Sequence, residues 1–152
     1  QRMKRDTTNY IVIHCSATPP SADIGREEIN RWHENRGWFG IGYHLVIRRD
    51  GSMEYGRAHD VQGAHVKGHN HESIGVCLVG GIDAEGHAED NLTEKQINTL
   101  HWVTKLLKDL YPGAQVLGHR DMPGVHKACP SFDAAEKLKD LEQWSWREGA
   151  LS

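Results

Sequence analysis

Short apolar runs separated by turn-forming segments dominate the first half of the chain. YIVIH (residues 10–14) and SIGVCLVGG (73–81) are continuous apolar runs, typical of strands buried on both faces of a sheet. GYHLVIRRDGSMEYG (42–56) holds two further runs joined by Asp50-Gly51, a strong hairpin signal. The pattern therefore predicts two central strands and one hairpin.

Helical spacing appears in the segments between and after these strands. Residues 26–36 repeat apolar and aromatic side chains at helical intervals, and Gly37 follows as a stop signal. A short strand is predicted at 114–117. A last amphipathic helix is predicted from Ala134 onward, carrying Leu138, Leu141 and Trp144.

The strongest helical pattern lies in LTEKQINTLHWVTKLLKDLYPG. Thr93 and Gln96 match a capping box, and Pro112-Gly113 ends the pattern. One face of this helix is predicted to be apolar and to pack on the sheet. The residues predicted on that face are Ile97, Leu100, Val103, Leu107 and Leu110.

Strands and helices that interleave in this way predict an α/β or α+β fold, with one central mixed sheet flanked by helices. The length of 152 residues fits a single domain. We expect an N-terminal tail at residues 1–9 and the domain at 10–152. Long loops are predicted at 56–72 and 118–132, and loops of this length in a small domain are usually functional.

Composition narrows the class of protein. A hydrophobic content of 38% and a charged content of 26% are typical of a folded globular chain. The net charge of −3 argues against a protein that coats nucleic acid, and no apolar run approaches the length of a membrane span. We therefore expect no nucleic-acid partner and no stable insertion into a membrane.

Candidate chemistry comes from two histidines and a cysteine near predicted strand ends. His14 closes the first strand, while His119 and Cys129 lie in the late loop. Two imidazoles and a thiolate at one sheet edge would bind Zn²⁺ and leave its fourth position for water. Taken one by one, however, each residue is better explained by a structural role, as a hydrogen-bonded histidine or a small buried cysteine.

The order of several blocks adds a resemblance to a known family. These blocks are HCSAT, GWFGIGYHLVI, RRDGSMEYGR, GAHVKGHNHESIGVCLVGGID and HKACPSFD. Together, from about Tyr10 to Asp133, they resemble the zinc-dependent N-acetylmuramoyl-L-alanine amidases, and most closely the phage members of that family. The GHRD sequence at the start of the late loop is also found in the related peptidoglycan recognition proteins.

The resemblance implies a role for each candidate residue. His14, His119 and Cys129 would hold one zinc ion, and Tyr43 and Lys127 would be the catalytic pair. His65 matches a substrate-contacting position in the family's cleft. Without the resemblance, the favoured interpretation is an ordinary strand aromatic for Tyr43 and an exposed loop charge for Lys127. The sequence leaves open which of the two moves a proton.

Two neighbours of these residues are expected to be structural. Cys15 lies on the opposite side of its strand from His14, because strand side chains alternate, and we expect it to be a buried packing residue. His44, next to Tyr43, is expected to be a buried, hydrogen-bonded histidine.

The family implies a peptidoglycan hydrolase, a phage endolysin that cleaves the amide between N-acetylmuramic acid and L-alanine. The alternatives are a non-catalytic peptidoglycan-binding or regulatory module and a muropeptide-recycling amidase. The cysteine at position 129 disfavours both alternatives. In this family the non-catalytic modules lose the thiolate ligand, and the recycling amidases commonly carry Asp at the corresponding position. We expect a monomer in the host cytoplasm that reaches the wall after the membrane opens; binding to a phage RNA polymerase, known for one phage member, is left open.

Overall fold

A five-stranded sheet forms the centre of the protein. The structure is a computed structural model and describes residues 3–139. The strands, in chain order, are β1 (Tyr10–Cys15), β2 (Leu45–Ile47), β3 (Met53–Tyr55), β4 (Ser73–Leu78) and β5 (Gln115–Gly118). Their order in the sheet is β3-β2-β4-β1-β5, and all neighbours are parallel except the β2–β3 hairpin. The predicted α+β fold with a mixed sheet is therefore confirmed.

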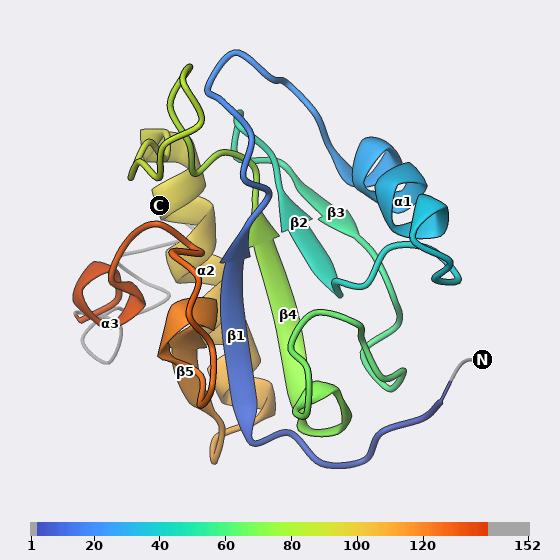
Figure 1. The fold of residues 1–152 in the computed structure, drawn as a ribbon. Helices are drawn as coiled ribbons and strands as arrows, with labels where there is room; N and C mark the ends of the chain where they lie inside the picture. The colour runs from blue at the N-terminus through green and yellow to red at the C-terminus, as the bar shows by residue number, and fades with distance from the viewer. Residues whose placement is uncertain (1–2, 140–152) are drawn as a thin grey trace.

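Helices pack on this sheet from both sides (Figure 1). They are α1 (Arg26–Asn35), α2 (Glu94–Leu110) and α3 (Ala134–Lys137), with short 3₁₀ turns η1 (Asn70–Glu72) and η2 (His119–Asp121). Among the described residues, no helix combines the length and the apolar character needed to cross a bilayer. Leu141 and Trp144, predicted in the last helix, lie outside the described residues.

The two faces of the sheet bury different partners. Ile11 and Ile13 of β1 pack in the core that contains the apolar residues of α2. Val12 belongs to a separate cluster with Val66 and Met122, which come from the long loops. Because strand side chains alternate, His14 shares the face of Val12 and lies on the side of the sheet away from α2.

The buried face of α2 differs in part from the prediction. Leu100, Val103 and Leu107 are buried as expected, but Leu110 is 63% exposed, so its predicted place in the core is wrong. Leu110 lies in the last turn of the helix, and the next residue, Tyr111, packs against the core instead.

Gln96 is fully buried in the first turn of α2, although it is polar. Its side-chain amide donates hydrogen bonds to the carbonyls of Ile47 and Val79, at 3.3 and 2.9 Å. Its side-chain oxygen accepts the N–H of Thr93 at 3.0 Å, which completes the predicted capping box. One side chain thus caps the helix and ties it to β2 and to the residue that follows β4.

The N-terminal segment lies against the loop that follows β3. Lys4 forms an isolated antiparallel bridge with Val61, and the N–H of Arg5 donates to the carbonyl of Asp60 at 2.8 Å. Part of the predicted tail is therefore hydrogen-bonded to the domain, and the boundary at residue 10 stays a prediction.

Candidate active site

Two histidine side chains lie next to each other at the carboxyl ends of neighbouring strands. β1 and β5 are parallel, and their register pairs Ile13 with Gly118. The residues that follow these two are His14 and His119, whose ring centroids are 4.5 Å apart. The carboxyl edge of parallel strands is the usual place for a site in an α/β sheet, and the register alone brings these imidazoles together.

Cys129 reaches the same place from the loop after η2. The N–H of Arg120 donates to the carbonyl of Cys129 at 2.7 Å, which closes this loop on itself. Gly118 allows the close approach, since a Cβ there would lie 2.9 Å from the ring of Pro130. The backbone N–H of Cys15 then donates to Sγ of Cys129 at 3.2 Å, a contact that favours the thiolate. The neighbouring Cys15 thiol and burial act in the opposite direction and raise the pKa of Cys129, so a bound cation would be needed to hold the thiolate form.

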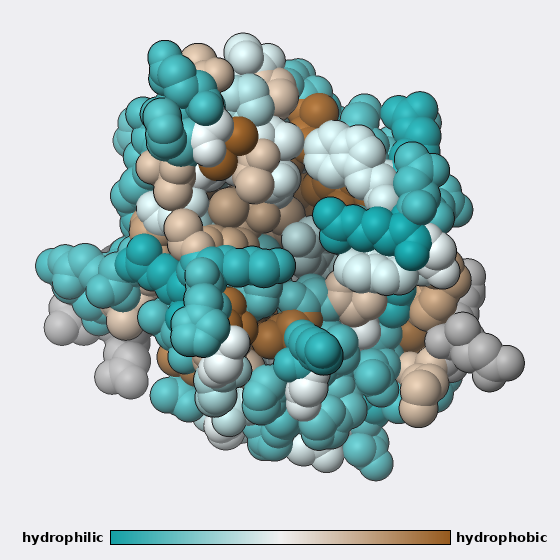
Figure 2. Space-filling view, in the orientation of Figure 1, coloured by the Kyte–Doolittle hydropathy of each residue, from teal (hydrophilic) through white to brown (hydrophobic). Residues whose placement is uncertain are grey.

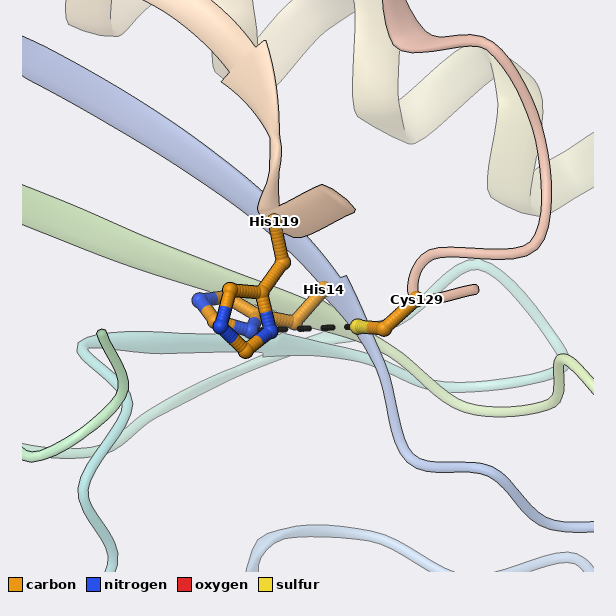
Figure 3. A group of neighbouring side chains, drawn as sticks. All are labelled: His14, His119 and Cys129. Carbon is orange, nitrogen blue, oxygen red and sulfur yellow. Dashed lines mark hydrogen bonds between the residues drawn. The ribbon is translucent and has the colours of Figure 1, made fainter. Parts of the chain in front are cut away.

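The three side chains form a compact group (Figure 3). One ligand atom of each residue lies within 4.8 Å of the others, and Nδ1 of His14 is 3.9 Å from Sγ of Cys129. Tetrahedral zinc would place such a nitrogen and sulfur about 3.6 Å apart, from the usual bond lengths. The predicted convergence of His14, His119 and Cys129 is therefore present, at a spacing that suits a metal ion. The face that carries the group is hollowed near its centre, and both hydrophilic and apolar residues surround the hollow (Figure 2).

Burial keeps the two imidazoles in the form that binds metals. It lowers the pKa of His14 well below its ordinary value. The neighbouring His65, His119 and Lys127 act in the same direction, because a further positive charge beside these basic groups is disfavoured. Burial also lowers the pKa of His119, again with a contribution from Lys127. Both rings are thus neutral at neutral pH, with a lone pair available for a cation.

Tyr43 and Lys127 flank the group. Tyr43 lies just before β2, and its ring centroid is 5.0 Å from that of His14. Burial raises the pKa of the Tyr43 phenol well above its ordinary value, so the hydroxyl stays protonated and can donate. Lys127 is exposed, and its charge acts on both histidines. The structure therefore places Tyr43 beside His14 and leaves Lys127 close enough for its charge to act on both histidines, while the catalytic roles of the two residues stay predictions.

His65 lies behind His14 instead of beside the thiol. Its Nδ1 is 2.8 Å from Nε2 of His14, and its Nε2 is 3.1 Å from Oγ of Ser73. The predicted contact of His65 with substrate is not tested by these distances, but both ring nitrogens have a partner within the protein. No sequence motif points to Ser73, and only its place at the start of the apolar run 73–81, just after the loop that contains His65, could have indicated it.

The two expectations of structural roles agree with the structure. His44 is fully buried; its Nδ1 accepts the N–H of Gly75 at 3.0 Å, and its Nε2 lies 2.8 Å from the carbonyl of Val61. Cys15 is 7% exposed, as expected for a packing residue, although its backbone also contacts Cys129.

Comparison with known proteins decides the family. The sequence profile of the N-acetylmuramoyl-L-alanine amidases matches residues 4–132 of the chain. The chain belongs to this family. The resemblance in the sequence motifs is thereby confirmed, and the amidase is a peptidoglycan hydrolase.

Phage enzymes are among its similar relatives. The amidase is 48% identical over 142 residues to the endolysin of Enterobacteria phage K11, which covers 93% of each chain. It is 44% identical over 151 residues to the endolysin of Escherichia phage T7, covering 99% of this chain and 93% of the relative.

Solved structures show the same fold. The amidase LysC from Clostridium intestinale URNW is 27% identical and superposes with a TM-score of 0.81, covering 93% of this chain and 90% of that one. The Drosophila protein PGRP-LB, at 22% identity, has a TM-score of 0.74 over 99% and 88% of the two chains. The latter likeness extends to the fold alone.

Proposed function

We propose that the amidase holds one zinc ion with His14, His119 and Cys129 and uses it to hydrolyse the amide between the lactyl group of N-acetylmuramic acid and L-alanine. The observation that carries this proposal is the convergence of the three ligand atoms within 4.8 Å at the ends of β1 and β5. The donor set fits zinc, because imidazole and thiolate are its preferred ligands, and three protein ligands are the usual number at a catalytic site.

The chain's own residues supply the remaining chemistry. Zinc, when bound, supplies Lewis acidity that polarises the amide carbonyl and acidifies water. Tyr43 offers a protonated phenol next to His14, placed to donate to an oxygen that gains negative charge. Lys127 is exposed, and its positive charge acts on His14 and His119, so it would favour a developing anion at the group.

The biological setting follows from the relatives. Those from phages K11 and T7 are endolysins. We place this protein in the same role, as a monomer that accumulates in the host cytoplasm and cuts the wall once the membrane has been opened. The alternative of a non-catalytic module is disfavoured, because the thiol of Cys129 and the phenol of Tyr43 are both in place.

The reaction is tested by digesting purified sacculi and identifying the products by mass spectrometry. We expect intact glycan chains and free stem peptides that begin with L-alanine. Digestion in the presence of a chelator should yield neither, and added zinc should restore both. Cleavage within the glycan, or within the peptide, would contradict the proposed reaction.

Removal of the metal should lower the melting temperature without unfolding the chain. A ligand that binds only the native state stabilises it by mass action, so the zinc form should melt higher than the chelated form. Since β1 and β5 are paired through their backbones, the sheet should persist without the ion. Circular dichroism during heating checks both points, and a disordered chelated protein would contradict them.

A further inference from the structure

A line of hydrogen bonds runs from the proposed zinc ligand His14 into the protein. Nε2 of His14 lies 2.8 Å from Nδ1 of His65. Nε2 of His65 lies 3.1 Å from Oγ of Ser73, and this hydroxyl donates to the carbonyl of His69 at 2.8 Å. Four groups are therefore connected, from the metal group to a backbone oxygen.

The carbonyl of His69, at the end of this series of hydrogen bonds, determines which group donates and which accepts in each of them. A carbonyl oxygen can only accept, so the single proton of the Ser73 hydroxyl is committed to His69. Ser73 must then accept from His65, which places the His65 proton on Nε2. A neutral His65 has no proton left for Nδ1, so that atom accepts from Nε2–H of His14. The remaining nitrogen of His14, Nδ1, is left with a free lone pair 3.9 Å from Sγ of Cys129.

We propose that His65 is a positioning residue, which holds His14 in the one tautomer and orientation that present Nδ1 to the metal. The inference rests on the proposed zinc site. It gives His65 a role through His14, in place of the direct contact with substrate that the sequence predicts.

The surroundings of His65 are built to hold its ring in this place. A Cβ on Gly75 of β4 would lie 2.7 Å from the ring, and a Cβ on Gly63 would also lie 2.7 Å from it. Two glycines thus make room for the imidazole over the sheet. The side-chain oxygen of Asn70 accepts the backbone N–H groups of His65 and Val66, both at 2.9 Å, which fixes the loop at this point.

Burial excludes water as a substitute partner. Ser73 is fully buried, and His14 is 1% exposed. Without His65, the Nε2–H of His14 would lose its acceptor, and nothing would select which nitrogen carries the proton. Outer hydrogen-bond partners of this kind commonly contribute roughly 10- to 100-fold to metal affinity.

The test compares two substitutions of nearly equal shape. His65→Leu removes the acceptor, whereas His65→Asn keeps a side-chain oxygen close to the position of Nδ1. Zinc affinity is measured by competition with a chromophoric chelator, and Co²⁺ spectra report whether the thiolate is bound. We expect His65→Leu to bind zinc about 10- to 100-fold more weakly than wild type, and His65→Asn to recover most of that loss.

The outcomes separate this inference from the proposed function. A wild-type protein that binds no zinc would overturn the metal site itself. Normal zinc affinity in His65→Leu, with a raised KM for muropeptide, would overturn the positioning role and favour contact with substrate. Equal losses in His65→Leu and His65→Asn would show that the acceptor is not the cause.

Ser73→Ala provides an independent variant if His65→Leu does not fold by circular dichroism. It leaves His65 in place but removes the group that orients its proton. We expect a smaller loss of zinc affinity, of several-fold, and a shift in the Co²⁺ spectrum. Unchanged affinity and an unchanged spectrum in this variant would overturn the proposal.

Discussion

Replacing Cys129 with Ser is expected to abolish zinc binding and amidase activity together. A hydroxyl is a far weaker zinc ligand than a thiolate, and the two histidines alone leave the ion with too few protein ligands. The loss should exceed the roughly 10- to 100-fold cost of losing an outer hydrogen-bond partner. Zinc content by elemental analysis and the rate of wall lysis measure the two effects on the same sample.

Cys77→Ala is the matched control for the loss of a thiol. Cys77 is fully buried beside His14 in the register of β1 and β4 and packs in a cluster that Tyr43 contacts, but its sulfur is not one of the three grouped ligand atoms. This variant should therefore keep one zinc per chain even if it is less stable. Muropeptide binding should survive in Cys129→Ser, because the histidines and the surrounding surface are unchanged. Full activity in Cys129→Ser would overturn the metal assignment.

Replacing Tyr43 with Phe is expected to separate binding from turnover. The change removes only the phenolic oxygen, and it leaves the packing against His14 and all three metal ligands in place. If the hydroxyl stabilises or protonates the transition state, kcat should fall on the order of 10²-fold or more. KM and zinc content should change little, because an interaction made mainly in the transition state does not contribute to binding of the substrate.

Tyr55→Phe serves as the control for the chemistry of the substitution. Tyr55 is 68% exposed at the end of β3, so the loss of its hydroxyl should leave lysis unchanged. Near-normal lysis by Tyr43→Phe would remove Tyr43 from the catalytic residues. A raised KM with normal kcat would instead assign its hydroxyl to the binding of substrate.

The sequence predicted the strands well because their signals are local. Continuous apolar runs identify β1 and β4, and Asp50-Gly51 marks the turn between β2 and β3, where Gly51 has a φ of +85°. The apolar face of α2 was predicted less accurately. Periodicity cannot show that a polar residue such as Gln96 will find buried carbonyl partners, or that the last turn will extend beyond the core.

The grouping of the candidate site residues could not be predicted from any local sequence pattern. His14 and His119 meet because β1 and β5 pair in one particular register, and spacing along the chain does not determine that register. The resemblance to a family supplied the grouping in advance. It did not supply the hydrogen bonds that join His14, His65 and Ser73, because no motif or spacing in the sequence indicates that these three residues are in contact.

The two ends of the described chain must both be present before the metal group can exist. Cys129 lies 115 residues after His14, and β5 joins the sheet beside β1, which is the first of the described strands in chain order. A nascent chain that ends before β5 has only one of the three ligands. Incomplete products that end before Cys129 therefore lack the metal group, and we expect them to have no wall-cutting activity.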